Sequence, residues 1–124
     1  MKSFDVVIVG GGPAGVSAAI SAHNTYPGKT LALIRKEAIA LIPCGIPYTQ
    51  HTLPDILSNT LPDGLVTEKA GAELIIDEVV GRDGNILKLG SGEEIAYSKL
   101  VLATGSHPSL PPIKGIEKEG VFLI

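Results

Sequence analysis

A glycine-rich segment near the amino terminus has the residue pattern with the clearest chemistry. Residues 10–15 have the sequence Gly-Gly-Gly-Pro-Ala-Gly and fit the pattern G-x-G-x-x-G. In this pattern Gly10 allows a tight turn, Gly12 lets a diphosphate approach the backbone, and Gly15 lets the following helix pack on the preceding strand. A helix starting at Pro13 adds unpaired amides, including that of Ala14, and about half a positive charge. The segment predicts a diphosphate site. The alternative is a turn that only joins strand to helix.

The lone cysteine, Cys44, is the second candidate for chemistry. A solitary Cys is more often a small buried hydrophobe than a reactive group. Cys44, however, stands between Pro43 and Gly45 rather than in a periodic apolar stretch. A redox-active thiol at this position would form a mixed disulfide or a sulfenic acid. Because the chain has no second Cys, an internal redox disulfide is excluded. The residues alone leave both interpretations of Cys44 open.

Three apolar runs indicate the elements that must position these groups. Residues 6–9, 31–34 and 100–103 are short and continuously apolar, which is typical of strands buried in a parallel sheet. Between the first two runs, small residues from Pro13 onward predict a helix that ends at Pro27-Gly28. The glycine loop therefore lies inside a β–α–β unit. The fold class is expected to be α/β, with a Rossmann-like nucleotide-binding arrangement.

The second half of the chain predicts a small antiparallel layer. Residues 72–80, 85–89 and 93–97 have the pattern of three short strands, with turns at 81–84 and 90–92. Residues 37–62 are rich in proline and predict loops and short helices. The expected architecture is therefore a three-layer fold, in which a parallel sheet is joined by a three-stranded antiparallel β-layer.

Further binding residues are expected where the buried strands end. Ligands of open α/β sheets gather at the carboxyl ends of the strands, so Ala103, Thr104 and Gly105 would stand beside the glycine loop. An acidic residue about twenty positions beyond the loop commonly holds a ribose hydroxyl, and Glu37 is the candidate here. Arg35 would cover an adenine or a phosphate. The alternative is that Arg35 and Glu37 belong to a solvated charge cluster.

Composition narrows the classes of function. The 124 residues suit one domain with a modest core, and the formal charge of −3 gives no electrostatic footprint for nucleic acid. Glycines and a proline interrupt the apolar stretch of residues 6–20, so no membrane anchor is expected. A single Cys fits a reducing, cytoplasmic setting. No metal site is expected.

Three motifs together resemble a known family. Residues 5–15, 43–48 and 102–106 are similar, in that order, to motifs of the pyridine nucleotide-disulfide oxidoreductases. The resemblance is to the single-cysteine branch, which contains NADH oxidases and coenzyme A-disulfide reductases. It implies FAD as cofactor, with Pro43 and Val79 also in contact with it. Two positions differ from the family: Pro13 stands where NADH peroxidases have a His, and the family's ribose acid usually stands nearer Ile34 than Glu37 does.

The resemblance also implies a function and a domain organisation. Residues 1–124 would be the N-terminal part of an FAD-binding domain, with the NAD(P)H-binding and dimerisation domains absent and residues 120–124 beginning a connection. The enzyme would be about three to four times longer than this chain and homodimeric. NAD(P)H would be the electron donor and Cys44 the redox centre. A disulfide, a sulfur species or oxygen would be the small-molecule acceptor. The isolated chain is expected to have no turnover.

Two alternative functions remain open from the sequence. One is a non-catalytic nucleotide-binding or interaction module. The other is a flavoprotein oxidoreductase, such as a monooxygenase-like or quinone-reducing enzyme, that does not use Cys44.

Overall fold

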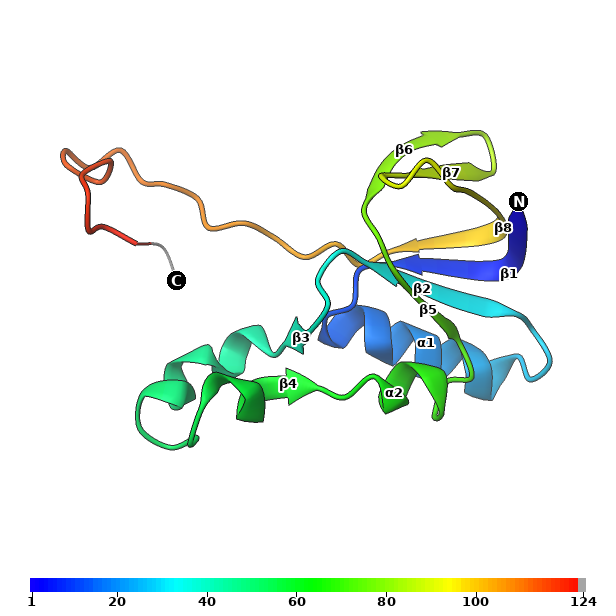
Figure 1. Cartoon of the computed structure of the whole chain (residues 1–124), viewed down its shortest axis with the longest axis horizontal. Coiled ribbons are helices and arrows are strands. Elements are labelled where there is room, and N and C mark those ends of the chain that lie inside the picture. Colours follow the sequence, from blue (N-terminus) through cyan, green and yellow to red (C-terminus); the bar gives the residue numbers. More distant parts are fainter. Residues whose placement is uncertain (123–124) are drawn as a thin grey trace.

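The protein is built on a six-stranded sheet with the strand order β5-β2-β1-β8-β7-β6 (Figure 1). The structure is a computed structural model, and it describes residues 1–122. The elements in chain order are β1 (Lys2–Val9), α1 (Pro13–Thr25), β2 (Leu31–Arg35), β3 (Ala40–Leu41), 3-10 helices at Pro43–Gln50 and Ile56–Asn59, β4 (Thr60–Leu61), α2 (Gly64–Thr67), β5 (Glu73–Ile76), β6 (Val79–Asp83), β7 (Ile86–Leu89) and β8 (Glu94–Leu102).

The predicted β–α–β unit is confirmed. Strand β1 pairs in parallel with β2 on one side and with β8 on the other, while α1 begins at Pro13 as expected. Helix α1 buries Gly15, Val16 and Ala19 because only small side chains let its axis lie close to the sheet. The core on this face also includes Ile8 and Leu33 from the central strands.

Strands β6 and β7 belong to the same sheet, but their hairpin folds over the face of the parallel strands that is opposite to α1. This gives the predicted three layers (Figure 1). Side chains on a strand alternate between faces, so Val7 points to the hairpin layer while its neighbour Ile8 points to α1. Leu87 and Ile95 complete the second core. Two cores on opposite faces explain why the central strands are continuously apolar.

Two strands expected to be separate are one. Residues 93–97 and 100–103 were predicted as distinct strands, but β8 runs without interruption from Glu94 to Leu102. Its first part pairs antiparallel with β7, and nearly its whole length pairs parallel with β1. The polar residues Ser98 and Lys99 interrupt the apolar pattern, yet the pairing of β8 with β1 begins before them at Ile95 and continues after them to Leu102. The antiparallel layer is therefore continuous with the parallel sheet.

The prediction of a single strand over residues 72–80 is wrong, because this segment forms two strands. The segment divides into β5, which pairs parallel with β2, and β6, which pairs antiparallel with β7. One straight strand cannot reach both partners, and the chain bends at Asp77 and Glu78. The turn expected at 81–84 is also shifted, because β6 continues to Asp83 and the turn falls at Gly84 and Asn85.

Residues 37–67 form a small lobe of short elements beside α1 (Figure 1), and the short helices expected within residues 37–62 are confirmed. It contains the β3–β4 pair, both 3-10 helices and α2.

Beyond β8 the chain leaves the sheet as an extended arm (Figure 1). Part of the connection expected at residues 120–124 falls on positions 123 and 124, which lie outside the described residues. Within residues 1–122, no helix has the length and apolar character needed to cross a bilayer.

Candidate functional site

The three spaced glycines of the loop meet three different local requirements. Gly10 has a φ of 114°, and a Cβ there would lie 2.0 Å from the carbonyl oxygen of Ala103. A Cβ on Gly15 would lie 1.9 Å from the carbonyl oxygen of Gly10. By contrast, no atom lies within 4 Å of the Cβ position of Gly12. The outer two glycines thus allow the backbones to pack, while the middle one faces open space.

Backbone hydrogen bonds hold the loop at the carboxyl edge of the sheet. The amide of Gly10 donates to the carbonyl of Ile34 at 2.8 Å, and the amide of Ala103 donates to the carbonyl of Val9 at 2.8 Å. The ends of β1, β2 and β8 therefore meet at one place. No described side chain caps the start of α1, and its first turn has no acidic residue. This edge is suited to an anion.

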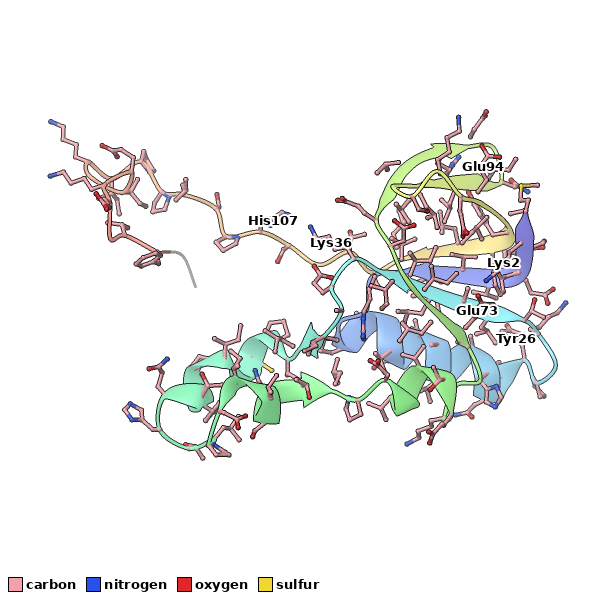
Figure 2. The ribbon with its side chains drawn as sticks, in the orientation of Figure 1. Lys2, Tyr26, Lys36, Glu73, Glu94 and His107 are labelled. Carbon is pink, nitrogen blue, oxygen red and sulfur yellow. The ribbon has the colours of Figure 1, made fainter. Side chains whose placement is uncertain are left out.

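A cleft of about 230 Å³ opens at this edge. The residues around it come from the carboxyl ends of β1 and β2, the segment after β5, the start of β6 and the segment after β8. They are Val9, Gly10, Ile34, Arg35, Lys36, Glu37, Asp77, Glu78, Val79, Thr104 and His107. Figure 2 shows Lys36 and His107 where the arm leaves the sheet.

The cleft brings together some of the residues predicted from the sequence. Gly10, Arg35, Glu37, Val79 and Thr104 all line it. The remaining predicted residues are not among its lining residues. These are Gly12, Pro13, Ala14 and Gly15 on the loop and helix side, Ala103 and Gly105 beside Thr104, and Pro43 and Cys44 in the small lobe.

Four charged or titratable lining residues were missed: Lys36, Asp77, Glu78 and His107. Asp77 and Glu78 directly follow β5, so they stand at the same carboxyl edge as the glycine loop. Nothing in the sequence indicates that a strand ends at Ile76. With that strand end known, both residues would have been predicted, because ligands gather at the carboxyl ends of strands.

Asp77 is present in this cleft as a carboxylate. A hydrogen bond from the Ser91 side chain, followed by the backbone amides of Glu78, Ser91 and Gly90, keeps the pKa of Asp77 below its usual value. The amide of Glu78 donates to its Oδ1 at 2.7 Å. Lys36 also lines the cleft, so both signs of charge border a space that would receive a polar ligand.

Arg35 is a buried arginine whose hydrogen bonds lie within the protein. Its side chain is 2 % exposed. Its Nε donates to the carbonyl of Glu37 at 2.9 Å, and one Nη donates to the carbonyl of Ala38 at 2.8 Å and to Asp63 Oδ1 at 2.7 Å. The guanidinium therefore stabilises the turn after β2.

Cys44 is exposed in the first turn of the 3-10 helix at Pro43–Gln50. The buried side chain of Asn59 holds this turn in place. Asn59 is 3 % exposed, and its Nδ2 donates to the carbonyl of Ile42 at 2.8 Å. The Ile42 amide donates to the Asn59 carbonyl at 3.0 Å, and the Gly45 amide donates to the Ile42 carbonyl at 3.0 Å. A Cβ on Gly45 would lie 1.8 Å from Asn59 Oδ1. The thiol is thus carried by a fixed backbone.

Nothing in the described part of the chain gathers three or more His, Cys, Asp or Glu side chains into a group that could hold a metal ion.

Comparison with known proteins places this geometry in context. A sequence profile of the family described as "Pyridine nucleotide-disulphide oxidoreductase" matches residues 4–124. An NAD(P)H coenzyme A polysulfide/persulfide reductase of Pyrococcus horikoshii is 34% identical over an alignment 124 residues long. The alignment covers 94% of this chain and 28% of that protein. An NADH oxidase of Methanocaldococcus jannaschii is 33% identical over 129 residues, covering 95% and 29%.

A solved structure shares the fold. The NAD-dependent persulfide reductase from A. fulgidus superimposes with a TM-score of 0.74 at 26% sequence identity, covering 94% of this chain and 24% of that one. The chain thus spans less than a third of the length of these relatives.

Proposed function

The chain belongs to the pyridine nucleotide-disulphide oxidoreductases, a family of flavin-dependent enzymes, and on that basis we propose that its glycine loop and cleft bind the ADP half of FAD. The observation that carries this proposal is the open space at Gly12 beside the uncapped start of α1. A side chain at Gly12 would fill the place where a diphosphate reaches the backbone amides.

Different residues of the chain then contact different parts of the ligand. The amides at the start of α1, those of Ala14 and Gly15, donate to the diphosphate, since Pro13 has no amide hydrogen. Glu37, which lines the cleft, accepts from a ribose hydroxyl, and the backbone of Val79 contacts the adenine. Thr104 and Gly105 continue the contact surface toward the flavin half.

When bound, FAD would carry the electron pair of a reduced nicotinamide to the oxidised form of Cys44, a mixed disulfide or a sulfenic acid, and so regenerate the thiol. The chain's part in this is to present that thiol on a rigid turn. Cys44 is exposed, and the hydrogen bond from Asn59 to the Ile42 carbonyl holds the turn that carries it, which supports this role. Further support comes from the relatives, which include a persulfide reductase and an NADH oxidase. Pro43 fixes the backbone just before the thiol.

The proposal extends to the organisation of the whole enzyme. Residues 1–124 are the N-terminal part of an FAD-binding domain in a protein about three to four times longer, a cytoplasmic homodimer with its NAD(P)H-binding and dimerisation domains beyond this segment. Its small-molecule acceptor is a disulfide, a sulfur species or oxygen. The 124-residue chain by itself has no turnover with NADH.

Flavin retention tests the cofactor. The purified chain is expected to take up FAD from solution, with flavin absorbance that ADP displaces in competition. ADP displacement matters because it assigns the affinity to the half of FAD that the cleft would hold. Absence of FAD uptake, or uptake that ADP does not affect, refutes the proposed site.

Stopped-flow reduction by NADH tests the role of Cys44 in the protein that carries the remaining domains. Cys44→Ser is expected to leave flavin reduction by NADH intact while abolishing turnover with a disulfide acceptor. The exposed Ser58→Ala of the small lobe is the control and is expected to keep both steps. Disulfide reduction that survives Cys44→Ser would favour the flavoprotein that does not use this cysteine.

A further inference from the structure

The end of strand β2 carries a charge of the wrong sign for the usual ribose contact. In dinucleotide-binding folds an acidic residue about twenty positions beyond the glycine loop holds a ribose hydroxyl. Here β2 ends at Arg35, which stands at that spacing from Gly15. A guanidinium has only donors and lacks the acceptor that the usual contact requires.

The buried guanidinium of Arg35 instead organises the backbone that follows it. Its donors reach the carbonyl oxygens of Glu37 at 2.9 Å and Ala38 at 2.8 Å, so residues 35–38 fold around the arginine head group. Bonds from a charged donor to two successive carbonyls fix both peptide planes.

Arg35 is itself held at two other places. Its aliphatic stem packs against the glycine loop, where a Cβ on Gly11 would lie 2.5 Å from Arg35 Cδ. Its head group reaches Asp63 at 2.7 Å. Asp63 stands at the N-cap of α2, yet its carboxylate makes no capping hydrogen bond to that helix. Helix α2 is anchored in the core by Val66, which is 1 % exposed, so the Arg35–Asp63 pair is attached to the core of the protein.

The outcome is a fixed backbone that carries Glu37 to the rim of the cleft. Glu37 is exposed and lines the cleft with Gly10 and Val79, and no described group hydrogen-bonds to its carboxylate. We infer that Arg35, held by Asp63, is a positioning residue that shifts the ribose-contacting acid from the end of β2 to Glu37. This inference rests on the proposed binding of the ADP half of FAD.

Affinity for ADP compared with 2′,3′-dideoxy-ADP, measured by calorimetry, isolates the ribose contact. The wild-type chain is expected to bind ADP about tenfold more tightly, because the analogue leaves a charged acceptor without its hydroxyl. Glu37→Ala is expected to bind the two ligands equally. Arg35→Met, which keeps the stem against Gly11, is expected to remove most of the preference as well.

Two variants separate positioning from folding. Arg35→Lys keeps the charge but cannot donate to two carbonyls and to Asp63 in the same geometry, so it should not rescue the preference. The double variant Arg35→Met with Glu37→Ala should lose no more preference than Glu37→Ala alone, because both act on one contact. Matched controls are the exposed Arg82→Met and Glu117→Ala, which should keep the tenfold preference.

The possible results distinguish the inference from its premise. If the wild-type chain does not bind ADP, the proposed function fails and the positioning role fails with it. If ADP binds and Glu37→Ala removes the preference while a folded Arg35→Met keeps it, the positioning role alone is refuted. If Glu37→Ala keeps the preference, the acid has been assigned wrongly. Unfolded variants are recognised by circular dichroism. Asp63→Ala, which removes the acceptor for Arg35 but leaves Arg35 and its carbonyl bonds in place, then decides, because an unchanged preference refutes the role of the Arg35–Asp63 pair.

Discussion

Replacing Gly12 by alanine should separate ligand binding from folding. Gly12 is the N-cap of α1, with φ −76° and ψ −175°, which is an extended conformation open to any residue. Its Cβ would meet no atom within 4 Å. Alanine is a poorer N-cap than glycine by about 0.5 kcal/mol, but it reduces the entropy of the unfolded chain by about as much. We therefore expect the free energy of unfolding to change by less than about 1 kcal/mol.

The same methyl group should be costly to the ligand. It would occupy the space through which a diphosphate reaches the amides of α1, and each lost hydrogen bond to a charged group is worth about 1.5–3 kcal/mol. One such bond corresponds to a loss of affinity of at least about tenfold. Calorimetric titration with ADP and urea denaturation followed by circular dichroism measure the two effects on the same samples.

Gly15→Ala should behave in the opposite way. Its Cβ would lie 1.9 Å from the Gly10 carbonyl oxygen, so α1 must move away from β1. Overpacking of this kind costs about 1–3 kcal/mol of stability. Gly81→Ala, whose Cβ would lie 3.9 Å from Lys88 Cβ, is the control and should lose neither stability nor affinity. The reasoning is refuted if Gly12→Ala binds ADP like the wild type, or if Gly15→Ala unfolds at the wild-type urea concentration.

Three further predictions concern other parts of the chain. Gly45→Ala should destabilise the protein by about 1–3 kcal/mol, measured by urea denaturation, because its Cβ would lie 1.8 Å from Asn59 Oδ1 and displace it. Cys44→Ser should change the free energy of unfolding by less than about 0.5 kcal/mol in the same assay, since the side chain is exposed; a larger loss would mean that the thiol is packed. Hydrogen bonds from the Thr30 backbone, the Lys29 side chain and the Thr30 hydroxyl lower the pKa of Asp5 from 3.8 to about 2. The ionised form is therefore favoured by folding, and this stability is present above about pH 4 and lost as the pH falls toward 2. Asp5→Asn should remove that part of the acid dependence, and an unfolding curve that falls equally steeply in both proteins would contradict the assignment.

The parts of the fold that follow from local pattern could be predicted from the sequence. The apolar run before the glycine loop, Pro13 at the helix start and the small residues after it all lie within one β–α–β unit, where each residue constrains its neighbours. The strand pairings of the second half depend on distant partners. Ser98 and Lys99 belong to one strand only because β1 runs beside them, and no local signal contains that information.

The candidate site divides along the same line. Gly10 and Thr104 could be found because each directly follows an apolar run, and Glu37 because it lies about twenty positions beyond the glycine loop. Asp77 and Glu78 were hidden in a segment that looked like one strand. The hydrogen bonds of Arg35 could not be predicted either, because its charged partner Asp63 lies 28 residues away in a proline-rich lobe with no periodic pattern. Contacts across such a distance appear only once the chain is folded.

The most direct test of the central claim is a titration of the isotope-labelled chain with ADP, followed by amide chemical shifts. The account predicts saturable changes at Gly12, Ala14 and Gly15 together with Glu37 and Val79, while the hairpin turn at residues 84–85 stays unchanged. Changes that leave the glycine loop unaffected, or no saturable change at all, would contradict the claim that this loop and its cleft bind a nucleotide diphosphate.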